Sequence, residues 1–162
     1  MGKWFDTAAC DEDFLKSAPF RYSYPIDLTV PAEQVWDGLC ADRPLSWVRG
    51  LDIHWTSPRP FGVASTRVAK VALGALCIQE RYFIWEEGQR NAFYAVRTNL
   101  PVFARFAEDY LVEPTPTGCL FTWTFAFEPL KPLTPAVRIS SRANEALFAA
   151  MANDTRRQFG GR

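Results

Sequence analysis

The alternation of apolar and polar residues predicts where the first strand of this chain lies. From residue 20 the period is two, and five apolar or aromatic side chains alternate with mostly polar ones: Tyr22, Tyr24, Ile26, Leu28 and Val30. A period of two predicts a strand with one buried face. Pro25, on the opposite face, favours an edge position because proline cannot donate a hydrogen bond to a neighbouring strand.

Two short helices and six further strands follow in the pattern. Pro31-Ala32-Glu33 opens a predicted helix over 31–40, and residues 44–48 fit a second short helix that Gly50 ends. The next segments have the lengths and the Gly- or Pro-containing breaks of antiparallel strands: 51–56, 64–72, 75–86, 91–98, 102–113 and 118–128.

The last long segment, 135–158, predicts a single helix. Pro135 suits the first helical position, and Gly160 and Gly161 end the run. About 24 residues at 1.5 Å per residue give roughly 36 Å, enough to cross a small domain. Small residues fill the early half of its inner face and bulky ones the later half. Such a helix either packs against something large or leaves room beside it.

The predicted order is strand, two short helices, six strands and one long helix. An antiparallel sheet of seven strands with one exposed face would curl around the helix. Its concave space has to be filled by side chains or by a ligand. Residues 1–19 are weakly patterned, with one short amphipathic turn over 11–16, and we interpret them as an N-terminal strap preceding a single domain, 20–162.

Composition narrows the function classes. Eighteen basic and eighteen acidic residues cancel, so no overall field favours nucleic acid or an anionic membrane. Four widely spaced cysteines and one histidine disfavour a zinc site, and we expect no metal. No nucleotide-binding glycine motif occurs, and we expect no cofactor. The absence of a leader-like start and of an 18-residue apolar run predicts a cytoplasmic protein without stable membrane insertion.

Three sequence blocks carry a resemblance to a known family: "VPAEQVWDGL" (30–39), "GVASTR" (62–67) with "QERYFIWEEGQR" (79–90), and "GCLFTWTFAFEP" (118–129). In this order they resemble the helix-grip (SRPBCC) superfamily, which includes START lipid-transfer domains, birch-pollen-allergen-like proteins and polyketide cyclase/dehydrase-like bacterial proteins. The resemblance implies an α+β helix-grip fold. It does not imply one activity, because the superfamily hosts carriers, hormone receptors and cyclases.

Glu80 is the most informative polar residue. In 75–86 the more apolar face comprises Leu76, Ile78, Glu80, Tyr82 and Ile84. A carboxylate among these side chains needs a partner or a proton. In the abscisic-acid receptors of the superfamily the matching Glu lines the hormone pocket. The alternative is a Glu held by an arginine as a structural pair, and a shift of one residue in strand parity would reverse its direction.

Arg97 and Arg105 are the candidate partners of Glu80, because each lies on a strand among apolar neighbours. The alternative for each is a solvent-facing arginine on the convex side. His54 is predicted to lie on the outer face and is a possible general base, although no nucleophile pairs with it. Glu108 and Asp109 are not expected to form a pair for acid–base chemistry with Asp52 or Asp27.

Nine residues form the predicted ligand-binding set, which draws on the inner faces of the strands and the slim half of the last helix: Tyr24, Glu80, Tyr82, Arg97, Trp123, Phe125, Ser140, Asn144 and Leu147. For Trp123 and Phe125 the alternative is an ordinary core position.

The leading hypothesis is a monomeric or homodimeric protein that binds a small, mainly apolar molecule between sheet and helix, oriented by Glu80 and an arginine. A second hypothesis is cyclase or dehydratase chemistry, with Glu80 as the proton carrier and Tyr82 or Arg97 stabilising an enolate. A third is a protein-interaction module with a filled core.

Overall fold

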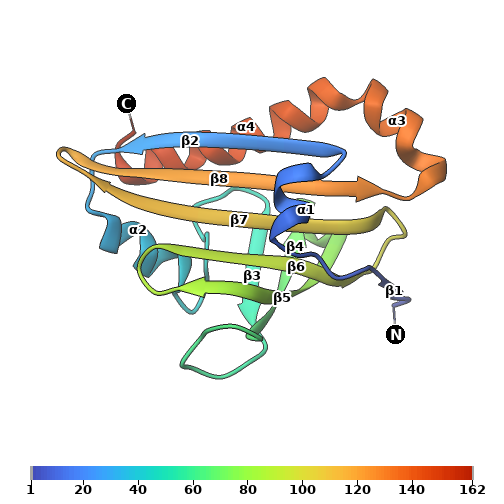
Figure 1. Cartoon of the computed structure of the whole chain (residues 1–162), viewed down its shortest axis with the longest axis horizontal. Coiled ribbons are helices and arrows are strands. Elements are labelled where there is room, and N and C mark those ends of the chain that lie inside the picture. The colour runs from blue at the N-terminus through green and yellow to red at the C-terminus, as the bar shows by residue number, and fades with distance from the viewer. Residues whose placement is uncertain (1, 162) are drawn as a thin grey trace.

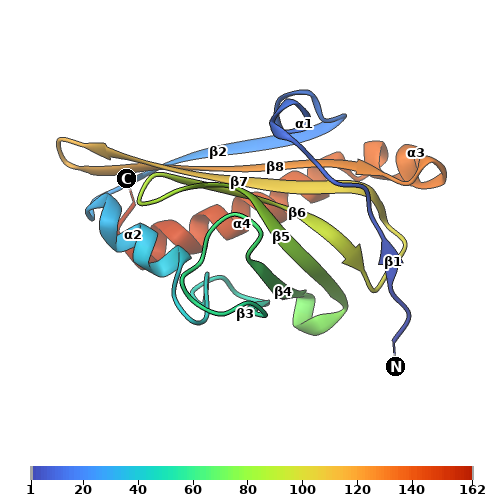
Figure 2. The same ribbon diagram turned by 60° about the horizontal axis from the view of Figure 1, so that its bottom comes forward.

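The computed structural model describes residues 2–161, and its framework is one curved antiparallel sheet with a helix along its concave face (Figures 1 and 2). Seven strands follow the order β2-β8-β7-β6-β5-β4-β3. Their bounds are Phe20–Leu28 (β2), Leu51–Trp55 (β3), Thr66–Val71 (β4), Leu76–Glu86 (β5), Arg90–Thr98 (β6), Phe103–Thr115 (β7) and Gly118–Pro129 (β8). This is the predicted helix-grip architecture.

The first strand and the helix that follows it form as the pattern predicts. The last two inward side chains of β2, Ile26 and Leu28, are buried. This strand lies at the sheet edge, where Pro25 is tolerated. Helix α2 (Ala32–Leu39) buries Val35, Trp36 and Leu39 against the core. The prediction of a second short helix over 44–48 is wrong, because these residues form turns, and Leu45 there has a positive φ of 55°.

The C-terminal helix is broken, contrary to the single helix predicted over 135–158. A short 3₁₀ turn, η2 (Lys131–Leu133), leads into α3 (Thr134–Ile139), and α4 (Ser141–Phe159) follows. Ser140 lies between them at φ −86° and ψ 11°, and its hydroxyl contacts the Val137 carbonyl at 3.3 Å. Serine competes for main-chain carbonyls in this way and bends helices.

Only the second half of α4 is firmly packed. Met151, Ala152, Thr155 and Phe159 are buried there, whereas α3 has no buried residue. Gly160 ends α4 in the left-handed conformation at φ 70°, as predicted, and its carbonyl accepts hydrogen bonds from the Thr29 main chain and hydroxyl. The helix is therefore anchored at its C-terminal end and stands off the sheet at its beginning.

The N-terminal segment lies on the outer face of the sheet. Strand β1 (Phe5–Asp6) pairs with the end of β6, and α1 (Glu12–Ser17) buries Phe14 and Leu15. These side chains pack with Cys10 against three alanines that β6, β7 and β8 present on their outer side: Ala92, Ala107 and Ala126. Because alanine side chains are small, these positions leave room for α1 to pack on the sheet.

Two bulges in the β5–β6 pair decide which side chains point inward. Glu80 pairs with Ala95 and Gln79 with Arg97, so Val96 is an extra residue in β6. Likewise Tyr82 pairs with Phe93 while Ile84 pairs with Ala92, so Phe83 is extra in β5. Glu80 and Tyr82 face the concave side as predicted. Beyond Phe83 the parity reverses, and Ile84 packs outside against the N-terminal segment.

Candidate functional site

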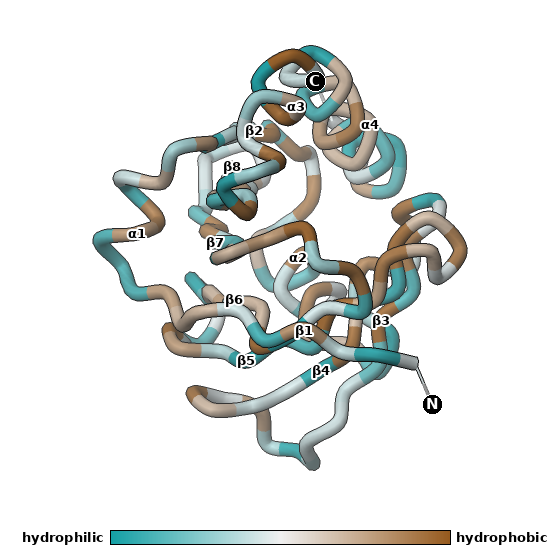
Figure 3. Tube along the Cα trace, turned by 90° about the vertical axis from the view of Figure 1, so that its right-hand side faces the viewer, coloured by the Kyte–Doolittle hydropathy of each residue, from teal (hydrophilic) through white to brown (hydrophobic). Residues whose placement is uncertain are grey.

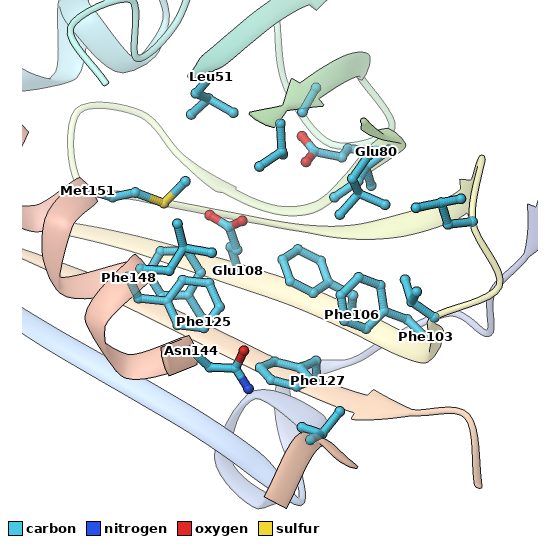
Figure 4. A pocket seen from close by; sticks show the side chains of 18 of the residues that line it. Leu51, Glu80, Phe103, Phe106, Glu108, Phe125, Phe127, Asn144, Phe148 and Met151 are labelled. Atoms are coloured by element: carbon cyan, nitrogen blue, oxygen red, sulfur yellow. The ribbon is translucent and has the colours of Figure 1, made fainter. Parts of the chain in front are cut away.

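A cavity of about 360 Å³ lies between the concave face of the sheet and the α3–α4 segment. Its walls are apolar, with aromatic rings from β7 and β8 and aliphatic side chains from β3, β4 and β5. Five polar side chains line it: Arg67, Glu80, Glu108, Ser140 and Asn144. In Figure 4, Glu80 and Glu108 reach into the same space from two strands, and Asn144 belongs to the helix that borders it.

The sheet wall of the cavity carries a buried ion pair. Arg67 on β4 stands opposite Glu80 on β5, and its Nε lies 2.5 Å from Glu80 Oε2. Both side chains are almost fully buried, with 1% and 2% of their surface exposed. Burial raises the pKa of Glu80, and Arg67 opposes that rise. Burial by itself would lower the pKa of Arg67, but the Glu80 carboxylate holds it well above its ordinary value.

The Arg67 guanidinium also lies among aromatic rings. Its central carbon is 4.1 Å from the centre of the Phe93 ring and within 6 Å of the rings of Tyr82, Tyr110 and Trp55. Cation–π attraction therefore offsets part of its desolvation. Its Nη1 atom has no hydrogen-bond partner among residues 2–161, a position that water or a polar ligand atom would satisfy.

A hydrogen-bonded chain connects this pair to a second carboxyl group. Arg67 Nη2 donates to the Tyr110 hydroxyl at 3.3 Å, and that hydroxyl donates to Glu108 Oε2 at 3.0 Å. Trp123 Nε1 donates to the same oxygen at 2.8 Å. The strand register brings these groups together, because Tyr110 pairs directly with Trp123 across β7 and β8.

The surroundings of Glu108 favour its protonated form at neutral pH. Burial, and then the nearby Glu80 carboxylate, raise its pKa to about 8, although Trp123, Arg67 and Tyr110 stabilise its charged form. Since Oε2 already accepts two hydrogen bonds, the proton belongs on Oε1. The cluster of Arg67, Glu80 and Glu108 is then neutral overall, and it places a hydrogen-bond donor and an acceptor in the wall of a mainly apolar cavity.

Six of the nine predicted residues line the cavity: Glu80, Trp123, Phe125, Ser140, Asn144 and Leu147. Three do not. Tyr82 is buried beside the cavity under Trp55 and Trp85, and its hydroxyl has no partner within residues 2–161. Tyr24 lies behind the wall, where its ring meets Phe125 edge-on and its hydroxyl donates to the Glu145 carbonyl.

Arg97 lies on the outer surface, so the expectation of an inward partner for Glu80 at this position is wrong. The bulge at Val96 reverses the parity of β6 before Arg97, whose Nε donates to Gln79 Oε1 at 2.6 Å. Arg105 is also outside and pairs with Glu128. His54 is half exposed beside Asp52, on the face predicted for it.

Arg67 and Glu108 were missed as site residues. Arg67 lies within the "GVASTR" block, and Glu108 lies at even spacing from the inward Phe106, Tyr110 and Val112. That period of two is the signal for an inward carboxyl group at this position. In residues 2–161 no three His, Cys, Asp or Glu side chains cluster in a way that could hold a metal ion.

Comparisons with known proteins agree with this architecture. Residues 19–159 match the family model described as "Polyketide cyclase / dehydrase and lipid transport". Uncharacterized proteins of Mycobacterium tuberculosis and Mycobacterium bovis are 35% identical over 128 residues, which cover 76% of this chain and 75% of theirs. None of the helices of residues 2–161 is long and apolar enough to span a bilayer.

Solved structures show the same fold at low sequence identity. The Bacillus cereus protein XoxI has a TM-score of 0.66 at 14% identity, over 86% of this chain and 94% of its own. Ginseng major latex-like protein 151 has a TM-score of 0.64 at 14% identity, over 88% and 99%. The aromatase/cyclase ZhuI from Streptomyces has a TM-score of 0.59 at 12% identity, over 85% and 94%.

Proposed function

Since the chain belongs to the polyketide cyclase/dehydrase and lipid transport family, we propose that it binds a small, neutral and mainly apolar molecule in the cavity between sheet and helix. The observation that carries the proposal is the buried polar cluster of Arg67, Glu80 and Glu108 in the sheet wall of a mainly apolar cavity. Pockets of this composition, with a few convergent polar groups, are typical of small-molecule sites.

The cluster favours a ligand with one polar end. Because Arg67, Glu80 and protonated Glu108 are neutral together, a charged ligand would be left without a counterion in an apolar space. A carbonyl oxygen of the ligand would accept a hydrogen bond from the protonated Glu108 carboxyl group. A hydroxyl group of the ligand would also donate a hydrogen bond to Glu80. We expect the protein to act in the cytoplasm, as a monomer or homodimer, and its free cysteines fit that compartment.

Native mass spectrometry of the protein purified from its own source, followed by extraction of bound material, tests this function. We expect a neutral, mainly apolar compound. A neutral fluorescent probe, N-phenyl-naphthylamine, gives a second test: Glu80→Gln and Glu108→Gln should weaken its binding, and Arg97→Gln on the outer face should not. The proposal would be contradicted if no compound copurified with the protein and N-phenyl-naphthylamine showed no saturable binding.

Acid–base catalysis is a second candidate, because the cavity holds two carboxyl groups in different protonation states. Protonated Glu108 would donate its proton to a substrate carbonyl oxygen, and ionised Glu80 would accept a proton from an adjacent carbon. Under this model Glu80→Gln abolishes turnover of a polyketide-like substrate while binding persists. Binding without turnover in the unaltered protein would remove this candidate.

A further inference from the structure

Four large aliphatic side chains stand exposed around one opening of the cavity. Their exposed fractions are 99% for Leu73, 87% for Ile139, 51% for Leu147 and 42% for Leu100. We call these four residues the mouth rim. They come from the turn η1 (Ala72–Gly74), the β6–β7 loop and the consecutive helices α3 and α4, three regions far apart in sequence.

The cavity lining places this rim at its mouth. Leu100 and Leu147 line the cavity themselves. Val71 and Leu76, which flank η1, also line it, and so does Ser140, the neighbour of Ile139. Figures 1 and 2 show the β6–β7 loop and α3 toward the same end of the molecule, opposite α2. Figure 3 looks onto that end and shows apolar segments there.

The turn that carries Leu73 is strained as well as exposed. Ala72 and Leu73 both have positive φ angles, of 50° and 59°. Residues with a Cβ atom rarely adopt this conformation, which asparagine or glycine would fill more easily. A leucine that is fully exposed on a strained turn makes no contact that stabilises the fold, and this points to an external partner.

The surroundings of the rim are basic. Lys70, Lys131, Arg138 and Arg142 are exposed and make no ion pair within residues 2–161. The segments that carry the rim, 66–78, 97–104 and 129–150, contain a single acidic residue, Glu145. The balanced charge of the whole chain therefore conceals a local excess of positive charge at the mouth.

We propose that the mouth rim docks on the surface of an anionic phospholipid bilayer. Exposed apolar patches of this kind mark interaction sites, and basic residues around them attract acidic headgroups. Peripheral, reversible docking places the mouth of the cavity against the lipid. An apolar ligand then passes between bilayer and cavity without crossing water. This inference goes beyond the proposed binding function. Docking on the bilayer can be measured with no ligand in the cavity, so its failure and the failure of ligand binding are distinguishable.

Flotation with vesicles tests the proposal. We expect the protein to bind phosphatidylcholine vesicles that contain phosphatidylserine, more strongly at low salt than at physiological salt, and to bind pure phosphatidylcholine weakly. Leu73→Asp combined with Ile139→Asp alters two rim residues that do not line the cavity, and should lower the partition coefficient by about tenfold or more. Arg138→Gln with Arg142→Gln should lower it by about fivefold for each charge.

The control variants carry substitutions of the same kind at positions away from the rim. Val63→Asp replaces an apolar residue that is 64% exposed in the β3–β4 loop, and Arg81→Gln with Arg157→Gln removes two charges away from the rim; both should bind as the unaltered protein does. Equal binding of rim and control variants, or no binding of the unaltered protein, would overturn the proposal. A dimer in ultracentrifugation that Ile139→Asp dissociates would overturn it too, since a second copy would then cover the rim.

Discussion

Arg67 Nε and Glu80 Oε2 lie 2.5 Å apart across β4 and β5, and neither side chain reaches bulk solvent. An ion pair in such a place is weak support for stability, because desolvation of both charges opposes their attraction. It holds one carboxylate at a fixed place beside an apolar cavity. The chain thus maintains a buried acceptor at a position where stability alone does not require charged residues.

Removing the cation alone should destabilise the fold strongly. In Arg67→Met the Glu80 carboxylate loses its partner, and we expect the free energy of unfolding to fall by about 3–5 kcal/mol. Urea unfolding measures this. The double variant Arg67→Met/Glu80→Leu should recover most of the loss, since no unpaired charge remains. Arg105→Met, which breaks a half-exposed pair with Glu128, should change stability by less than about 1 kcal/mol and serves as the control.

Glu108 should make stability depend on pH. Its pKa is raised from 4.5 in the unfolded chain to about 8 in the folded one, so the folded state binds more protons between these values. The free energy of unfolding therefore falls as pH rises through this window, by up to about 1.4 kcal/mol per pH unit, and levels off above it. Below pH 4.5 the stabilisation is complete.

Urea unfolding of Glu108→Gln at a series of pH values isolates this effect. Glutamine keeps an acceptor for Tyr110 and Trp123 but does not titrate, so the variant should lose the part of the slope that Glu108 contributes. The variant and the unaltered protein should differ most above pH 8, where the variant is the more stable. Identical slopes in both proteins would show that Glu108 is not a neutral acid in the folded state.

Arg97 offers a test of the strand parity. Because the Arg97 side chain lies outside, where it contacts Gln79 and the Trp4 ring, Arg97→Ala should change the free energy of unfolding by no more than about 0.5 kcal/mol. Binding of N-phenyl-naphthylamine should be unchanged. A large loss of binding would instead place this residue in the cavity and contradict the bulge at Val96.

The order of strands and helices could be predicted from the sequence, because the period of the apolar residues, the Gly and Pro breaks and the segment lengths are local properties of the chain. Glu80 was found in the same way, since the alternation around it holds from Leu76 to Tyr82. Arg97 was misplaced because a bulge changes parity without any mark in composition. Arg67 was missed because its pairing with Glu80 depends on the register between two strands, which the sequence of either strand does not contain.

The beginning of the C-terminal helix, where the side chains facing the cavity are small, should control access to the cavity. Asn144 lines the cavity from α4, whereas its neighbour Ala143 is exposed and does not. In Asn144→Phe the ring would enter the space that a ligand needs, and we expect the affinity for N-phenyl-naphthylamine to fall by more than about tenfold. The melting temperature should stay the same or rise, because the new side chain buries apolar surface. Ala143→Phe adds the same bulk on the outside and should leave binding intact. Equal affinities of the two variants would mean that the probe binds elsewhere, and that the space beside the helix is not the binding site.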